Sequence, residues 1–123
     1  MPRVVHFEIH AADPARAVKF YGDLFGWKAT KWDGPMEYWL VDTGEGNGIN
    51  GAILSRQGDA PTAGAPVNAY VCTVGVDSID DTIAAIAKAG GRIVVEKMEI
   101  PAVGWLCYAH DPEGNIFGVM QPM

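Results

Sequence analysis

The chain has 123 residues, of which 49% are hydrophobic, and it carries a formal net charge of −6 at pH 7. This length and apolar content suffice for one domain with its own core. The acidic balance, without a cluster of lysine and arginine, argues against a nucleic-acid partner, and no apolar run is long enough to cross a membrane.

Two features of the sequence favour a cytoplasmic location. No basic and then apolar leader follows Met1, so we expect a soluble protein made without a secretory signal. The two cysteines, Cys72 and Cys107, lie within apolar strand-like runs. A reduced and buried thiol is the usual state of a cysteine in such a run.

The first half of the chain begins with a predicted strand over residues 4–10. Its residues alternate between an apolar and an ionisable face, as in a half-buried strand. The two faces are formed by Val5, Phe7 and Ile9 and by His6, Glu8 and His10.

A helix is predicted to follow from Asp13 to Gly26. Asp13 is a suitable N-cap, Pro14 fits the first helical position, and Gly26 can end the helix in a left-handed conformation. The predicted buried stripe has the spacing i, i+3, i+4, i+7 and consists of Ala17, Phe20, Tyr21 and Leu24. Further strands are predicted at residues 27–32, 36–43 and 49–54.

The same order of elements is predicted again after residues 56–66, a connector that is rich in chain-breaking residues. A capping box at Asp77-Ser78 and Asp81 starts a second helix, and Gly90-Gly91 ends it. Its apolar stripe consists of Ile79, Ile83 and Ile86. Strands are predicted before and after this helix, at residues 67–76, 92–98, 105–109 and 116–121.

These elements predict an α+β fold in which the same unit of one helix and four strands occurs twice. Two tandem β-α-β-β-β modules, residues 3–55 and 67–123, are expected to form one domain of cupped mixed sheets with the helices on the outer face. The order of residues supports the duplication, because Trp39 and Gly51 in the first module are echoed by Trp105 and Gly118 in the second.

The chain resembles the vicinal oxygen chelate superfamily, which includes glyoxalase I, extradiol dioxygenases and bleomycin-resistance proteins. The resemblance covers essentially the whole chain. The Ile100-Pro101-x-x-Gly104-Trp105 run is similar to a bacterial glyoxalase-like branch of unassigned activity. The other residues that carry the resemblance are His6-x-x-Ile9-x-x-x-Asp13, Phe20-Tyr21-x-x-x-Phe25-Gly26-Trp27 and Asp111-Pro112-Glu113-Gly114-Asn115.

This resemblance implies where a divalent metal would be held, with one ligand on the first strand and one on the last strand of each module. His6 matches one of these positions. The others fall on Gly51, Gly118 and Val71, or on Tyr70 if the register differs by one. Because glycine and valine offer no donor atom, we expect no metal cofactor; the alternative is a Zn, Ni, Mn or Fe ion bound with the help of other residues.

His6, Glu8 and His10 are the candidate catalytic residues. They lie two residues apart on one strand face, about 6.5–7 Å per step, so neighbours can share a proton. The alternatives are a solvated strand face or a metal site built from these three residues. Where Glu8 is near a histidine, we expect its charge to raise the pKa of that imidazole.

Four residues are candidates for ligand binding: Trp39, Asn50, Trp105 and Cys107. The two tryptophans and Cys107 are expected on the concave face, where they would enclose a flat or apolar ligand; packing in the core is the alternative. Cys107 shows no sign of being a nucleophile, and His110 is expected at a turn. The Gly-x-Gly-x-x-Gly pattern at residues 46–51 lies between strands, which argues against dinucleotide binding.

Two functions follow from this sequence. In either case the resemblance implies a homodimer. The first is a protein that binds a small molecule in an aromatic-lined cup without the full metal site of the family. The second is a glyoxalase-like lyase or isomerase acting on a small oxygenated substrate, with either a metal or the His6 and Glu8 pair as catalyst. The acidic charge suits the first function, and the three ionisable residues suit the second.

Overall fold

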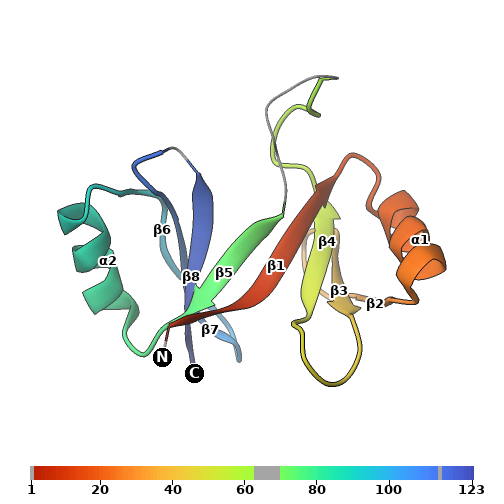
Figure 1. Ribbon diagram of the computed structural model, residues 1–123, viewed down its shortest axis with the longest axis horizontal. Coiled ribbons are helices and arrows are strands. Elements are labelled where there is room, and N and C mark those ends of the chain that lie inside the picture. Colours follow the sequence, from red (N-terminus) through yellow and green to blue (C-terminus); the bar gives the residue numbers. More distant parts are fainter. Residues whose placement is uncertain (1, 63–69, 114) are drawn as a thin grey trace. The chain divides into compact units, whose positions relative to one another are not determined.

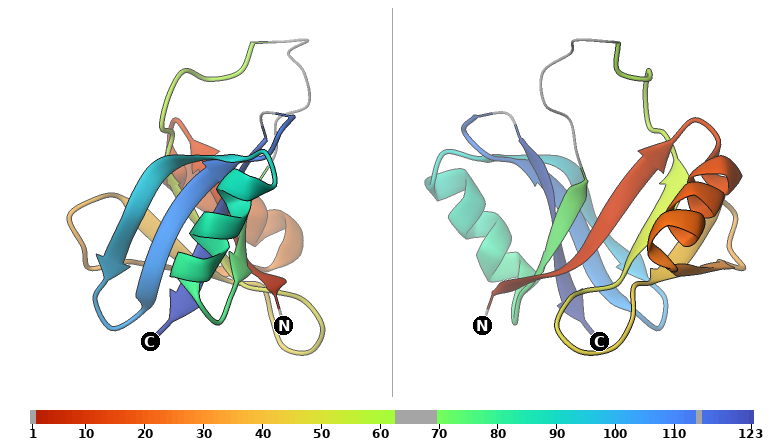
Figure 2. Two further views of the ribbon diagram at one scale, coloured as in Figure 1. Left: turned by 90° about the vertical axis from the view of Figure 1, so that its left-hand side faces the viewer. Right: turned by 45° about the vertical axis from the view of Figure 1, so that its right-hand side comes forward.

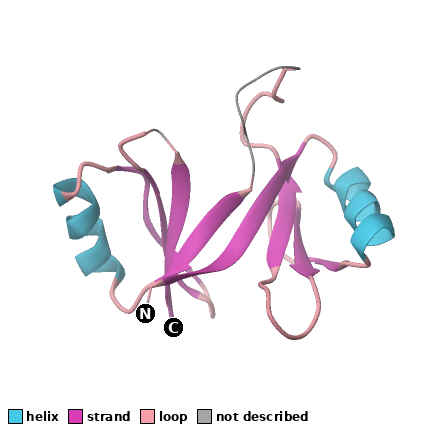
Figure 3. Ribbon diagram, viewed as in Figure 1, coloured by secondary structure: helices cyan, strands magenta, loops and turns pink. Residues whose placement is uncertain are grey.

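The computed structural model describes residues 2–62, 70–113 and 115–123. Within these residues the chain forms eight strands and two helices, which confirms the α+β class (Figure 3). Two compact units can be distinguished, the N-terminal unit of residues 6–70 and the C-terminal unit of residues 1–5 and 71–123. Residues 63–66 of the predicted connector and 67–69 of the strand predicted after it lie outside the described residues.

The first module follows the predicted order of one strand, one helix and three strands (Figure 1). In the sheet of this module the strands are ordered β2-β3-β4-β1, with β1 parallel to β4 and the other neighbours antiparallel. The elements are β1 (Arg3–Ala11), α1 (Pro14–Phe25), β2 (Lys28–Lys31), β3 (Tyr38–Asp42) and β4 (Gly51–Ser55).

Both ends of α1 have the predicted capping residues. The Asp13 carboxylate accepts a hydrogen bond from the Arg16 backbone N–H at 3.2 Å, and Pro14 occupies the first turn. At the other end Gly26 has φ of 75° and donates its backbone N–H to the Gly22 carbonyl at 2.9 Å. Local chemistry therefore determines the bounds of this helix.

The buried stripe of α1 differs from the predicted one. Phe20 and Leu24 are each 57% exposed, so their assignment to the core was wrong. The helix is rotated so that the i, i+3, i+4, i+7 stripe begins one turn earlier. It consists of Pro14, Ala17, Val18 and Tyr21, and the last three pack against the core residues Phe7, Ile9, Ala11, Val41 and Ile53.

The second module repeats the architecture with its helix against three of its strands (Figure 2). Its strands are ordered β5-β8-β7-β6, with β5 parallel to β8 and the other neighbours antiparallel. The elements are β5 (Val71–Gly75), α2 (Ile79–Lys88), β6 (Arg92–Ile100), β7 (Gly104–His110) and β8 (Ile116–Pro122).

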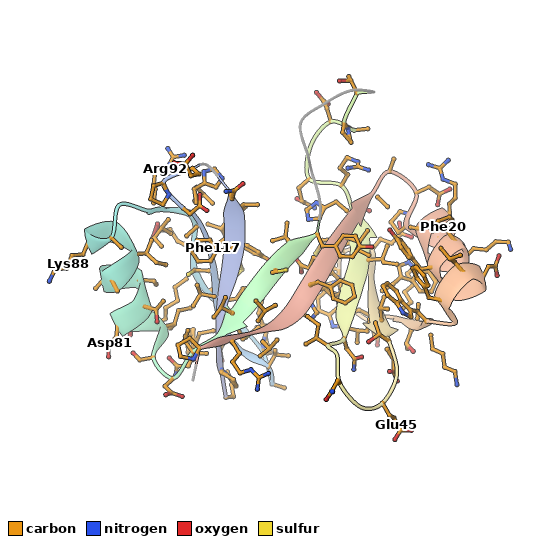
Figure 4. The ribbon with its side chains drawn as sticks, viewed as in Figure 1. Phe20, Glu45, Asp81, Lys88, Arg92 and Phe117 are labelled. Carbon is orange, nitrogen blue, oxygen red and sulfur yellow. The ribbon has the colours of Figure 1, made fainter. Side chains whose placement is uncertain are left out.

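The predicted stripe of α2 is confirmed. Ser78 caps the helix by accepting the Asp81 backbone N–H at 3.2 Å, and Gly90 has φ of 97° just after the last turn. Ile79 is buried against Cys107 and Val119, and Ile83 and Ile86 pack beside them. The labelled Lys88 extends from the helix away from the strands (Figure 4).

In the described part of the chain, neither helix has the length and apolar composition that a membrane-spanning helix needs.

Candidate active site on β1

The ionisable face of β1 lies on the side of the sheet away from α1. Phe7 and Ile9 point into the core under the helix, so His6 and Glu8 point to the opposite face. This face is not open to water at Glu8, whose residue is only 7% exposed. The solvated-strand alternative therefore fails at this position.

A tyrosine connects the two ionisable residues. The Tyr38 hydroxyl donates a hydrogen bond to Glu8 Oε2 at 2.8 Å, and His6 Nε2 lies 3.0 Å from the same hydroxyl oxygen. Tyr38 belongs to β3 and reaches β1 across β4. Ala52, which is paired with Glu8 on β4, is small enough to leave room for it.

The hydrogen bonds define which nitrogen of His6 carries the proton. Because the Tyr38 hydroxyl donates to Glu8, it accepts from His6, and Nε2 must be the protonated nitrogen of the neutral ring. Nδ1 then has the lone pair of the neutral imidazole. His6, Tyr38 and Glu8, which we call the His6 relay, thus form a chain in which a base is oriented by a carboxylate through a hydroxyl.

Burial determines the direction in which the pKa of His6 is shifted. Desolvation lowers the pKa of His6 below its ordinary value of 6.5, and the nearby Glu8 charge raises it by a smaller amount. The expectation that Glu8 would dominate was wrong for this histidine. The physical reason is that Tyr38 lies between the imidazole and the carboxylate, while the ring itself is withdrawn from water. His6 is therefore neutral at pH 7 and able to accept a proton.

His10 is not brought into this chain. Its ring Nδ1 accepts a hydrogen bond from the Gln57 backbone N–H at 3.4 Å, at the end of β1 where α1 begins. Of the three predicted catalytic residues, His6 and Glu8 are thus connected through Tyr38, and His10 is hydrogen-bonded elsewhere. The sequence analysis missed Tyr38, because only the pairing of β3 with β4 and of β4 with β1 brings it to this face.

The predicted ligand-binding residues lie elsewhere. Trp39 packs into the core under α1, and Trp105 packs against the buried cluster of Cys107, Ile79 and Val119 under α2. The expected placement of Trp39, Trp105 and Cys107 on the concave face was wrong, because each points to the helix side of its sheet. Burial also raises the pKa of the Cys107 thiol, which keeps it protonated.

Asn50 has a structural contact in the N-terminal unit. Its side-chain oxygen accepts the Thr43 backbone N–H at 2.9 Å and so closes the loop between β3 and β4. This loop contains the Gly-x-Gly-x-x-Gly pattern, and β4 rather than a helix follows it. The argument against dinucleotide binding at this pattern therefore holds in the structure.

The strand registers revise the predicted match between the modules. Glu8 pairs with Ala52 five residues before the N-cap Asp13, and Thr73 pairs with Gly118 five residues before the N-cap Ser78. Gly118 therefore corresponds to Ala52 and not to Gly51.

The tryptophans are displaced in the same comparison. Trp39 pairs with Ile53, the residue after Ala52, whereas the residue after Gly118 is Val119, which pairs with Cys107. Trp39 thus corresponds to Cys107 and not to Trp105. The predicted equivalence of the two tryptophans was wrong by two residues.

The residues present do not fit the metal site that the resemblance implies. On the faces away from the helices, the last strands carry Ala52 and Leu54 in one module and Gly118 and Met120 in the other. None of these side chains has a donor for a hard or borderline metal ion. Within residues 2–62, 70–113 and 115–123, no three His, Cys, Asp or Glu side chains are grouped to hold an ion.

A family model for the Glyoxalase/Bleomycin resistance protein/Dioxygenase superfamily matches residues 3–119. The chain belongs to this superfamily. The resemblance stated from the sequence is thereby confirmed.

Superfamily members with related sequences include two bacterial proteins. The chain is 39% identical over 64 residues to Putative glyoxylase CFP32 of Mycobacterium bovis, a match that covers 52% of the chain and 24% of that relative. The chain thus spans about a quarter of that relative's length. It is 26% identical to a Probable lactoylglutathione lyase of Vibrio parahaemolyticus, with 97% of the chain and 90% of that protein covered.

The superfamily fold is also found in solved structures. Methylmalonyl-CoA epimerase from Mycobacterium tuberculosis matches with a TM-score of 0.73 over 98% of this chain and 87% of that one. The sequence identity is 16%, so this similarity establishes the fold alone.

Proposed function

We propose that the protein is a glyoxalase-like isomerase or lyase that moves a proton on a small oxygenated substrate, with His6 as the base. The observation that carries this proposal is the His6 relay, in which Tyr38 joins His6 to Glu8. An orienting hydrogen bond to the base is a recurring feature of acid–base sites.

The relay suits removal of a proton from carbon next to a carbonyl group. The Nδ1 lone pair of neutral His6 accepts the proton, and the electron pair of the broken C–H bond moves onto the carbonyl oxygen. The imidazolium that forms is stabilised by the Glu8 carboxylate through Tyr38. Delivery of a proton from solvent to the opposite face of the planar enolate inverts the carbon. In a substrate with a hydroxyl on the carbon that lost the proton, return of the proton to the former carbonyl carbon isomerises it.

Two of the similar proteins have names that agree with such chemistry. One is named a lactoylglutathione lyase and the other a methylmalonyl-CoA epimerase. Their substrates, which are thioesters by name, are reasonable first probes for this chain. No step of the proposed reaction requires the metal that the residues do not fit.

Binding of a small molecule without turnover is the second candidate. The net charge of −6 and the buried Glu8 favour a neutral or cationic ligand. Under this alternative His6 and Tyr38 would orient the ligand by hydrogen bonds. The partner is a small molecule in both cases, and by family resemblance we include a homodimer in the cytoplasm in the proposal.

Exchange of substrate hydrogen with solvent tests the function. Lactoylglutathione and methylmalonyl-CoA would be incubated with the protein in D2O, and loss of the C–H signal followed by ¹H NMR. We expect exchange with at least one of them, reduced about 100-fold in His6→Ala because a positioned base contributes about 10² to 10⁴. The matched control is His110→Ala, whose ring lies beside Arg92 in the C-terminal unit.

The outcome also separates the two candidates. Exchange that persists in His6→Ala would rule out the relay as catalyst. No exchange with either probe, together with saturable binding that weakens in His6→Ala, would favour the binding protein instead.

A further inference from the structure

A depression with a volume of about 450 Å³ lies where β1 ends and α1 begins. Its size falls in the range of about 300–1,000 Å³ that is usual for small-molecule sites. Its lining includes the apolar residues Ile9, Ala17 and Phe20 and the basic residues Arg16 and Arg56. It lies at the end of β1 and does not include His6, Tyr38 or Glu8.

Arg56, a residue of this lining, has an unsatisfied donor. Its backbone N–H donates to the Ala11 carbonyl at 3.0 Å, which fixes the residue beside the end of β1. Its side-chain Nε is buried, and the described residues offer it no hydrogen-bond acceptor. Buried donors are nearly always paired, so the Arg56 guanidinium would gain a hydrogen bond by turning toward an acceptor in the depression.

The other charged groups favour an anion. Arg16 adds a second guanidinium from the first turn of α1. Asp13 is the carboxylate in the lining, and one of its oxygens already accepts the Arg16 backbone N–H. The His10 ring, also in the lining, accepts from the Gln57 backbone N–H. The lining thus contains two arginines and one aspartate, and guanidinium forks match carboxylate geometry.

The apolar part of the lining determines what the anion is attached to. Phe20 is 57% exposed and packs edge-on against Tyr21, with the ring centroids 5.1 Å apart. It can cover the face of a flat or apolar group. A bare inorganic ion would leave this surface unused.

We propose that the depression, which we call the α1 pocket, binds a small organic carboxylate. Arg16 and Arg56 hold the carboxylate, and Phe20 covers the apolar body. The proposal is independent of the acid–base function, because the residues that carry it are not those of the relay. Failure of one therefore leaves the other standing.

Titrations followed by ¹H–¹⁵N NMR test the α1 pocket with four probes: sodium benzoate, sodium acetate, inorganic phosphate and benzamide. Benzoate is expected to give saturable shifts at the amides of residues 11–13, 15–17 and 56–57. Acetate should bind more weakly because it lacks the apolar body. Benzamide, which has the ring without the charge, should not bind.

Four variants and one control locate the contacts. Arg16→Gln and Arg56→Gln should each weaken benzoate binding at least tenfold, and Arg56→Lys should also weaken it because lysine keeps the charge but lacks the planar guanidinium fork. Phe20→Ala should weaken benzoate and leave acetate unchanged. The matched control is Lys19→Gln, on the same helix but paired with Asp23 and outside the lining.

Several results would overturn the proposal. These are no saturable shift with benzoate, equal binding of benzamide, tighter binding of phosphate than of benzoate, or an equal effect of Lys19→Gln. The dispersion of each variant's spectrum shows whether it is folded. If Arg56→Gln is not folded, Arg56→Lys and Arg16→Gln carry the test, and unchanged affinity in both would contradict the proposal.

Discussion

Tyr38 changes what His6 and Glu8 can do. Two side chains that alternate on one strand are separated by about 6.5–7 Å, which is too far for a direct hydrogen bond. The hydroxyl spans this gap with contacts of 3.0 and 2.8 Å. A base and its carboxylate thus act together without forming an ion pair, so the imidazole stays neutral until it takes a proton.

The pKa of His6 provides a prediction at this scale. Burial should place its titration below 6.5 in an NMR experiment, and Glu8→Gln should lower it further because the charge that opposes desolvation is removed. The isosteric glutamine keeps an acceptor for Tyr38. A His6 pKa above 6.5 would show that the Glu8 charge outweighs burial, and a pKa unchanged by Glu8→Gln would show that the relay does not couple these residues.

The same shift links stability to pH. Because the folded-state pKa of His6 is lowered, the unfolded chain binds more protons just below pH 6.5. This residue therefore contributes a loss of stability as pH falls below 6.5 and no dependence well above it. Urea unfolding of wild type and His6→Gln between pH 7.5 and 5.5 should show a weaker pH dependence in the variant.

Within the strands, Gly51 is required by a close approach of the backbone. A Cβ at this position would lie 2.5 Å from the Phe7 carbonyl oxygen and 2.6 Å from the Phe7 ring. Gly51→Ala should therefore destabilise the protein by about 1–3 kcal/mol in urea unfolding, as overpacking in a core does. Gly58→Ala is the matched control, since nothing lies within 4 Å of its added Cβ, and an equal loss in both would refute the steric argument.

The helices show which features can be predicted from a short stretch of sequence. Asp13, Gly26 and Ser78 could be predicted as capping residues because a cap depends on a few neighbouring residues. The buried face of α1 could not, since Phe20 and Val18 are both apolar and only the docked helix distinguishes them.

The strands show a second limit of prediction from the sequence. The sequences around Trp39 and Trp105 are apolar on both faces, so alternation alone does not reveal which face meets the helix. His6 and Glu8 were identified because their strand alternates clearly between apolar and ionisable residues. Tyr38 depends on the register of three strands, information that no single stretch of sequence contains.

For the whole molecule, native mass spectrometry of the purified protein tests two expectations together. By family resemblance we expect an assembly of twice the 13.2 kDa chain mass. We also expect less than one divalent metal per chain, because the last strands present Ala52, Leu54, Gly118 and Met120 where donors would be needed. A single mass at 13.2 kDa would contradict the dimer. One ion per chain that is lost in His6→Ala would restore a metal site.

The parallel pairs β1–β4 and β5–β8 have a consequence for how the chain folds. In each module the first strand pairs with the last one, so residues such as Phe7 and Gly51 must meet across almost the full module. Closing so long a loop costs entropy before any parallel contact forms, whereas the β2–β3 pair is local. Each module is therefore completed by its last strand to emerge during synthesis, and a chain that stops before β4 or β8 leaves the first strand of that module without its parallel partner.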